Sequence, residues 1–333
     1  MDYRSESPEI LKSFLTYHEN IKGHSAKTVD EYYLDLRIFF RYLKQIRGLC
    51  PADADFEEIS IADIDLDFIK KITLSDVYRF LNFLSRDRDT PNKGRSSGGG
   101  LSPASRARKI ATIRSFFKYL TNKEKVLDEN PIKELESPKI KKSLPKYLSL
   151  DESLRLLEAV DGVNRERNYC IITLFLNCGL RISELTGLNL ADISEDHIRV
   201  LGKGNKERIV YINDACAEAI NGYMQKRKLL RPKEPKALFI SRNGNRVSRS
   251  AIHDMVKKTL LKANIDPTSY SSHKLRHTAA TLMLQNGVDV RTLQELLGHD
   301  HLNTTQIYTH VDSSELRMAA RANPLSSVKQ KKK

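Results

Sequence analysis

Residues 272–310 read SHKLRHTAATLMLQNGVDVRTLQELLGHDHLNTTQIYTH, and this stretch determines how the rest of the chain is interpreted. His273, Arg276 and His277 follow the i, i+3, i+4 spacing, so on a helix they share one face. A largely apolar run continues to Asn286-Gly287, a residue pair that ends helices. We therefore expect a core helix whose first turn carries a cluster of basic side chains.

A second helix is expected directly before another histidine. Gly298 stops it, so that His299 is presented at a helix end. The polar residues 303–305 then cap a short helix that carries Tyr308 about one turn in. The apolar stripe of the second helix consists of Val290, Leu293, Leu296 and Leu297.

A tyrosine that follows two basic clusters indicates a particular chemistry. A phenol with an ordinary pKa near 10 is a poor nucleophile. Neighbouring cations lower the cost of forming the phenolate, and the same cations suit a phosphate. Each histidine alone, or Tyr308 alone, is more often a structural residue, so the prediction depends on the combination. The combination predicts nucleophilic attack by Tyr308 on a phosphodiester.

A metal site is the competing interpretation of the first helix. His273 and His277 have the i, i+4 spacing of zinc-binding helices. The second residue of that motif should be Glu, but it is Lys274 here, and Arg276 would repel a cation. We therefore expect no metal.

The charge of the chain predicts its partner. Lys and Arg number 56 against 42 Asp and Glu, which gives a net charge of +14 over 333 residues. This balance is expected of a protein that binds a polyanion, and double-stranded DNA is the leading candidate. No apolar run reaches the length of a membrane span, and MDYRSESPEI does not resemble a signal peptide, so a cytoplasmic location is expected. The four cysteines (Cys50, Cys170, Cys178 and Cys216) show no paired metal spacing and are expected to be reduced.

An earlier arginine also lies at a position that requires an anion. Arg181 follows an apolar helix directly and lies near the start of the next one, where the helix dipole disfavours a cation. Either an ion pair with Glu184 or a bound phosphate would compensate. Residues 198–201 and 209–212 are β-rich and flank Gly202–Lys206, which predicts a β-hairpin. Its glycines lack the nucleotide-binding loop pattern, so ATP is not implied.

Five short motifs in a fixed order resemble one family. HKLRH, LLGH and IYTH, preceded by GLRISEL and LGKGNKERIVYI, are similar to the tyrosine recombinases and particularly to their Xer branch. The resemblance implies a site-specific recombinase that acts on DNA without metal, ATP or another cofactor. It implies that Glu184 supports the first arginine. It also implies the catalytic set Arg181, Lys203, His273, Arg276, His299 and Tyr308.

The family mechanism assigns a role to each of these residues. Tyr308 attacks the phosphorus to give a 3′-phosphotyrosine, and Lys203 protonates the leaving 5′ oxygen, with Lys206 as a weaker candidate. The two arginines stabilise the charge on the phosphate, His273 acts in acid–base support and His299 donates a hydrogen bond. The resemblance further implies a homo-tetramer on two DNA sites and the resolution of chromosome dimers. The need for a second recombinase or an accessory activator is left open.

The expected fold is mainly α with a small β-hairpin, arranged as a two-domain, C-shaped DNA clamp. The resemblance implies a helical core-binding domain over residues 1–125, joined by a basic, proline-rich linker (126–147) to the catalytic domain (148–312). It also implies that the C-terminal helix and tail (313–333) dock on a neighbouring subunit, and the apolar residues expected to do so are Leu316, Met318 and Ala319. A helix starting at Ser102-Pro103 has a basic face, which is either a solvated surface or a DNA contact. The predicted DNA-binding residues are Arg106, Arg108, Lys109, Arg114 and Lys206.

Three alternatives remain open at this point. A mobile-element integrase would use the same chemistry but often has an additional N-terminal arm-binding domain, which is not visible before the first helix. A type IB topoisomerase shares the tyrosine, arginines and lysine but not the wording of these motifs. A DNA-binding protein without catalytic activity would need only the basic helices.

Overall fold

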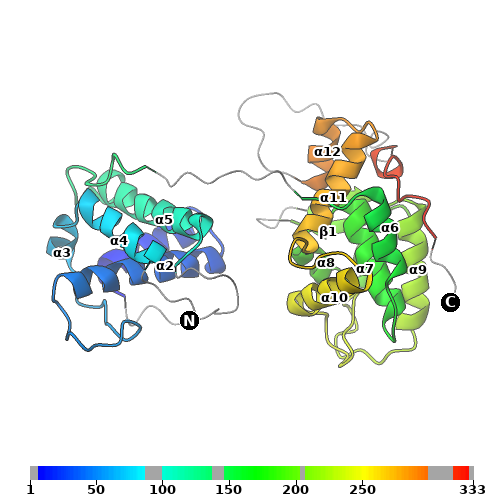
Figure 1. The fold of residues 1–333 in the computed structure, drawn as a ribbon, viewed down its shortest axis with the longest axis horizontal. Coiled ribbons are helices and arrows are strands. Elements are labelled where there is room, and N and C mark those ends of the chain that lie inside the picture. The colour runs from blue at the N-terminus through cyan, green and yellow to red at the C-terminus, as the bar shows by residue number, and fades with distance from the viewer. Residues whose placement is uncertain (1–6, 87–99, 137–145, 203–206, 299–317, 330–333) are drawn as a thin grey trace. The chain divides into compact units, whose positions relative to one another are not determined.

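The computed structural model describes residues 7–86, 100–136, 146–202, 207–298 and 318–329. The chain separates into two compact units, residues 1–142 and 143–333, each with its own hydrophobic core (Figure 1). The predicted Lys203, Lys206, His299 and Tyr308 lie outside the described residues. None of the helices in the described ranges is long and apolar enough to cross a membrane.

The N-terminal unit is helical throughout its described elements (Figure 1). Ser25 and Ser102 cap their helices by accepting the backbone N–H three residues on. The helix after the acidic segment is capped by Thr73, because Thr73 and Asp76 exchange side-chain-to-backbone hydrogen bonds. The elements are α1 (Glu9–Thr16), the π-helical turn η1 (Tyr17–Ile21), α2 (Ala26–Ile46), α3 (Leu66–Lys70), α4 (Leu74–Arg86) and α5 (Pro103–Asn122).

The N-terminal core extends beyond the predicted domain boundary. α2 packs against α4 and α5, and Phe14 of α1 meets Phe116 of α5 edge to face, with ring centroids 5.3 Å apart. Leu127, Ile132 and Leu135 belong to the same core, although the sequence predicts that they lie in the linker. The unit therefore continues past residue 125, because these apolar side chains are buried against the helices.

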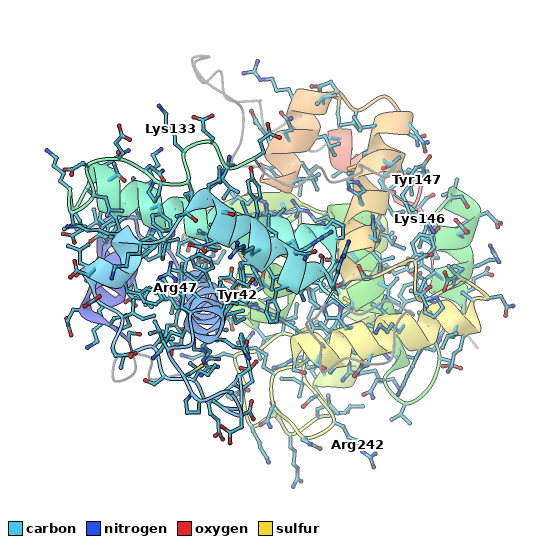
Figure 2. All side chains as sticks on the ribbon, turned by 60° about the vertical axis from the view of Figure 1, so that its left-hand side comes forward. Tyr42, Arg47, Lys133, Lys146, Tyr147 and Arg242 are labelled. Carbon is cyan, nitrogen blue, oxygen red and sulfur yellow. The ribbon has the colours of Figure 1, made fainter. Side chains whose placement is uncertain are left out.

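The acidic segment between α2 and α4 is folded onto α2. Arg41 donates to the carbonyl of Ile59 (2.8 Å), and Lys44 donates to Asp63 (2.6 Å). Arg47, labelled in Figure 2, donates to the carbonyl of Lys71 (3.0 Å). Basic residues one turn apart along α2 thus bind the segment, whose function the sequence did not predict.

The second unit surrounds a nearly all-buried helix, α7 (Arg165–Cys178), which packs against α9 (Asp214–Arg227) and α11 (Ser272–Gln285). The predicted hairpin is present as β1 (His197–Leu201) and β2 (Glu207–Tyr211), antiparallel with His197 opposite Tyr211. The other elements are α6 (Leu150–Glu158), α8 (Ile182–Gly187), the 3₁₀ turn η2 (Leu190–Asp192), α10 (Arg249–Lys262) and α12 (Val290–Leu297).

Residues 318–329 pack on the second unit of their own chain. Asn323 donates to the carbonyl of Leu176 on α7 (2.9 Å), and Asn213 donates to the carbonyl of Ala320 (3.1 Å). Leu325 is fully buried, and Ala319 is also buried. Ala319, one of the residues predicted to dock on a neighbouring subunit, is thus buried within its own chain. Leu316, another of them, lies outside the described residues.

Candidate active site

Arg181 lies at the turn between α7 and α8. Gly179 ends α7 with φ +58°, a left-handed conformation that suits glycine, and the chain then re-enters a helix with Arg181 at its N-cap. The backbone N–H of Arg181 donates to Glu184 Oε2, and its Nη1 donates to Glu184 Oε1, each at 2.8 Å. The predicted Arg181–Glu184 ion pair is therefore present.

Glu184 is the centre of a cluster of arginines. Its carboxylate receives a two-pronged interaction from Arg208 of β2, with Nη1 and Nη2 donating at 2.7 and 3.0 Å. Arg276 Nη1 lies 3.9 Å from Glu184 Oε2. Burial alone would raise the pKa of Glu184, but hydrogen bonds and charge from Arg208 and Arg181 outweigh it, and the pKa is lowered. Glu184 is thus a carboxylate at neutral pH.

Arg276 is buried on α11, on the helix face that the sequence predicted. Its Nη1 donates to the carbonyl of Gly179 (2.6 Å) and its Nη2 to that of Leu297 (2.7 Å). These carbonyls lie at the C-terminal ends of α7 and α12, where helix dipoles favour a cation. Burial, and then the charge of Arg181, lower the pKa of Arg276 to about 10, so it remains charged at neutral pH.

The end of α12 is held by all three arginines of the cluster. Arg208 Nε donates to the carbonyl of Leu296 (3.4 Å), Arg276 to that of Leu297 (2.7 Å) and Arg181 to that of Gly298 (2.9 Å). Residue 299, the predicted phosphate-binding histidine, follows directly in the chain. Three successive carbonyls are therefore matched to three guanidinium groups.

The cluster carries more positive charge than its own carboxylate neutralises. Three arginines surround Glu184, and among the described residues it is the one acid that raises the pKa of Arg276. Arg181 keeps 34% of its side-chain surface exposed, so part of this charge is accessible. Such a cluster suits a phosphate, because arginine forks match phosphate oxygens.

His273 lies in the first turn of α11, next to this cluster. Burial lowers its pKa, and the charges of Arg276, His277, Lys274 and Arg181 lower it further. Its imidazole is therefore neutral at pH 7 and able to accept a proton. This state suits the acid–base role that the family resemblance implies.

The predicted DNA-binding residues on α5 differ in their burial and in their partners within the chain. Lys109 is buried and donates to Asp35 of α2 at 2.6 Å, an ion pair that the sequence did not predict. Arg108 forms a two-pronged pair with the same carboxylate (2.9 Å twice) but keeps about half of its side chain exposed. Arg114 donates to the backbone carbonyl of Leu135, and Arg106 is half-buried.

Sequence reasoning missed Arg208, although a signal was available. Along β2, side chains alternate between the two faces, and Arg208 shares its face with buried Val210, whereas Glu207 and Ile209 are exposed. A cation on the buried face of a strand requires a partner, which here is Glu184.

Comparisons with known proteins agree on one family. Residues 146–315 match the phage integrase family. The chain is 50% identical to the tyrosine recombinase XerC of Caldanaerobacter subterraneus subsp. tengcongensis over 320 residues, which is 96% of this chain and 88% of that protein. It is 35% identical to XerD of Staphylococcus aureus (strain Mu50), covering 92% of this chain and 96% of that protein.

Solved structures show the same fold. The XerH site-specific recombinase bound to its difH substrate has a TM-score of 0.60 at 24% identity, covering 93% of this chain and 84% of that chain. A lambda integrase dimer bound to a core site has a TM-score of 0.58 at 17% identity, covering 90% of this chain and 99% of that one. The predicted fold class, mainly helical with a small hairpin, is confirmed.

Proposed function

Because the chain belongs to the phage integrase family and is a site-specific tyrosine recombinase of the Xer type, we propose that Tyr308 is its nucleophile and Arg181 and Arg276 its phosphate-binding pair. The observation that carries the proposal is the convergence of both arginines on Glu184, at 2.8 and 3.9 Å. Two like charges held this close to a single carboxylate favour a bound anion. They would stabilise the extra negative charge of the pentavalent transition state.

The steps of the reaction balance without a metal or a nucleotide. The Tyr308 oxygen attacks the scissile phosphorus and loses its proton to a base, for which neutral His273 is suited. The bond from phosphorus to the 5′ oxygen breaks, and Lys203 supplies the proton that the leaving oxygen takes up. The product is a 3′-phosphotyrosine and a free 5′-hydroxyl. Attack by the 5′-hydroxyl of another strand reverses these steps and rejoins the DNA.

The assembly follows from the exchange of strands between two duplexes. Each cleaved strand needs one Tyr308, so exchanging two strands on each of two sites requires four subunits. The proposal is thus a homo-tetramer on two specific DNA sites. Resolution of chromosome dimers in the cytoplasm is the proposed role, and the net charge of +14 supports the DNA partner.

A nicked suicide duplex tests the proposal, because the nick lets the short 5′ fragment diffuse away and traps the covalent intermediate. Wild type and Tyr308→Phe are compared in EDTA without ATP, on candidate chromosomal sites and on random DNA. The expected result is a protein–DNA band on a denaturing gel for wild type on one site only, and none for Tyr308→Phe. A band of equal intensity with Tyr308→Phe, or no band on any site while binding is intact, would overturn it.

A further inference from the structure

We infer that Arg208 is a positioning residue for the recombination reaction: it fixes Glu184 and the end of α12, and so holds Arg181 and Arg276 in the geometry that phosphate requires. Arg208 is not among the residues that the family resemblance assigned. The inference deepens the proposed function and depends on it, because it concerns the same phosphate-binding pair.

The first observation is that Arg208 binds both carboxylate oxygens of Glu184. It donates to both carboxylate oxygens, 2.7 Å to Oε1 and 3.0 Å to Oε2, and this two-pronged geometry fixes the carboxylate plane. Arg181 uses the same two oxygens, through its side chain and its backbone N–H. The orientation of Arg181 is therefore set by the carboxylate that Arg208 holds.

The second observation is the link from β2 to α12. Arg208 Nε donates to the carbonyl of Leu296 at 3.4 Å, the first of the three carbonyls held by the arginine cluster. Gly298 has φ +63°, and a Cβ atom there would lie 2.9 Å from Cδ of Arg208 and 3.1 Å from Cζ. The side chain of Arg208 thus occupies the space beside Gly298, whose carbonyl accepts from Arg181.

These contacts make Arg208 a support that does not need to reach the DNA itself. Its side chain is 16% exposed, against 34% for Arg181. Without Arg208, Glu184 would lose the partner that fixes its plane, and the end of α12 would lose one of its three donors. Misplacing a reacting group by about 1 Å can cost about 10²-fold in rate.

The test compares Arg208→Met with Arg208→Lys in the full chain, using single-turnover cleavage of the suicide duplex. Methionine keeps an apolar stem but removes the charge and the fork, whereas lysine keeps the charge on a single nitrogen and lacks the planar guanidinium fork. We expect a loss of about 10- to 100-fold for Arg208→Met, a smaller loss for Arg208→Lys, and unchanged DNA affinity for both. Rates are compared at equal folded concentration, measured by circular dichroism.

A second substrate separates positioning from a general loss of structure. Replacing one non-bridging oxygen of the scissile phosphate by methyl removes its charge, and with it much of the demand on the arginine pair. The loss caused by Arg208→Met should then shrink to a few-fold. Equal losses on both substrates would show a merely structural role and overturn the inference.

A matched control is Arg227→Met. Arg227 is also a buried arginine that donates to backbone carbonyls, those of Leu238, Pro235 and Ala237, but it does not contact Glu184. Folded Arg227→Met should cleave both substrates at the wild-type rate. If wild type gives no covalent product, the proposed function fails, and the role of Arg208 fails with it. If wild type and Arg208→Met cleave equally fast, the role of Arg208 alone is wrong.

Discussion

Asp35 in the N-terminal unit and Glu184 in the second unit are both buried carboxylates surrounded by basic side chains. Asp35 binds Arg108, Lys109 and Thr112 of α5 at 2.6 to 3.0 Å. Glu184 binds Arg181 and Arg208 at 2.7 to 3.0 Å. In distances alone the two sites are nearly equivalent.

The difference between them is their balance of charge. Arg108 and Lys109 face two acids, Asp35 and Glu31, so the N-terminal cluster is close to neutral. The second cluster has three arginines and one carboxylate. A buried basic residue therefore indicates an anionic ligand only when its neighbours leave its charge unbalanced, because a neutralised cluster has no further need of an anion.

The largest expected effect is on the unbalanced cluster. Arg276→Ala should reduce the rate of single-turnover cleavage by about 10²- to 10³-fold, because it removes a preorganised donor that stabilises the charge developing on the phosphate. The measurement is the rate of covalent complex formation on the suicide duplex, with DNA affinity determined separately. A loss below about tenfold would be inconsistent with its place in the phosphate-binding pair.

A substitution in the charge-balanced cluster around Asp35 should reduce the stability of the protein. Asp35→Asn leaves Lys109 buried without its counter-charge and should lower the free energy of unfolding by about 3–5 kcal/mol. Urea denaturation of the full chain, followed separately in its two transitions if they are resolved, measures the loss. Wild-type stability in Asp35→Asn would show that the ion pairs on α5 contribute nothing to folding.

The pH dependence of the cleavage rate tests the role of His273, which lies next to the unbalanced cluster. Its pKa is lowered by burial and then by Arg276, so the neutral, proton-accepting form persists below pH 6.5, the ordinary pKa of histidine. The cleavage rate should be insensitive to His273 between pH 6.5 and 8 and should fall only at more acidic pH. His273→Gln should cleave more slowly and lose this acidic limb. A limb centred above pH 6.5 would contradict the assignment.

The smallest expected effect concerns DNA affinity. Lys118 is exposed on α5 and Lys109 is buried. If Lys118 contacts a phosphate, Lys118→Met should reduce the slope of log K against log salt concentration by about 0.9, whereas Lys109→Met should leave it unchanged. Filter binding at several salt concentrations measures both slopes. A reduced slope for Lys109→Met would contradict this expectation and show that Lys109 contacts a phosphate.

Periodicity predicted the parts of the site that lie on one element. The i, i+3, i+4 spacing placed His273 and Arg276 on one face of α11, and the i, i+3 spacing paired Arg181 with Glu184. Both are local relations, which a helix fixes by its geometry. The motif order supplied the remaining candidates, including Lys203, His299 and Tyr308, whose roles stay predictions.

Tertiary packing decided what the sequence did not reveal. α5 buries a second face through Lys109, Thr112 and Phe116, because α2 presents Asp35 to it, and one helix alone gives no sign of that partner. The sequence predicts Leu127 in the linker, because its local composition gives no sign of the helices that bury it in the N-terminal core. Arg208 meets Glu184 because β1, the strand paired with β2, packs against α8, and the two residues lie 24 positions apart in the chain.

The most direct test of the account is a side-by-side measurement of single-turnover cleavage by Glu184→Gln and Asp35→Asn at equal folded concentration. Both substitutions remove one buried negative charge that basic side chains surround, two at Asp35 and three at Glu184. The account predicts wild-type cleavage for Asp35→Asn and a loss of about 10²-fold for Glu184→Gln, because of these two carboxylates it is Glu184 that contacts the phosphate-binding arginines. Wild-type cleavage by Glu184→Gln, or equal losses in the two variants, would contradict it.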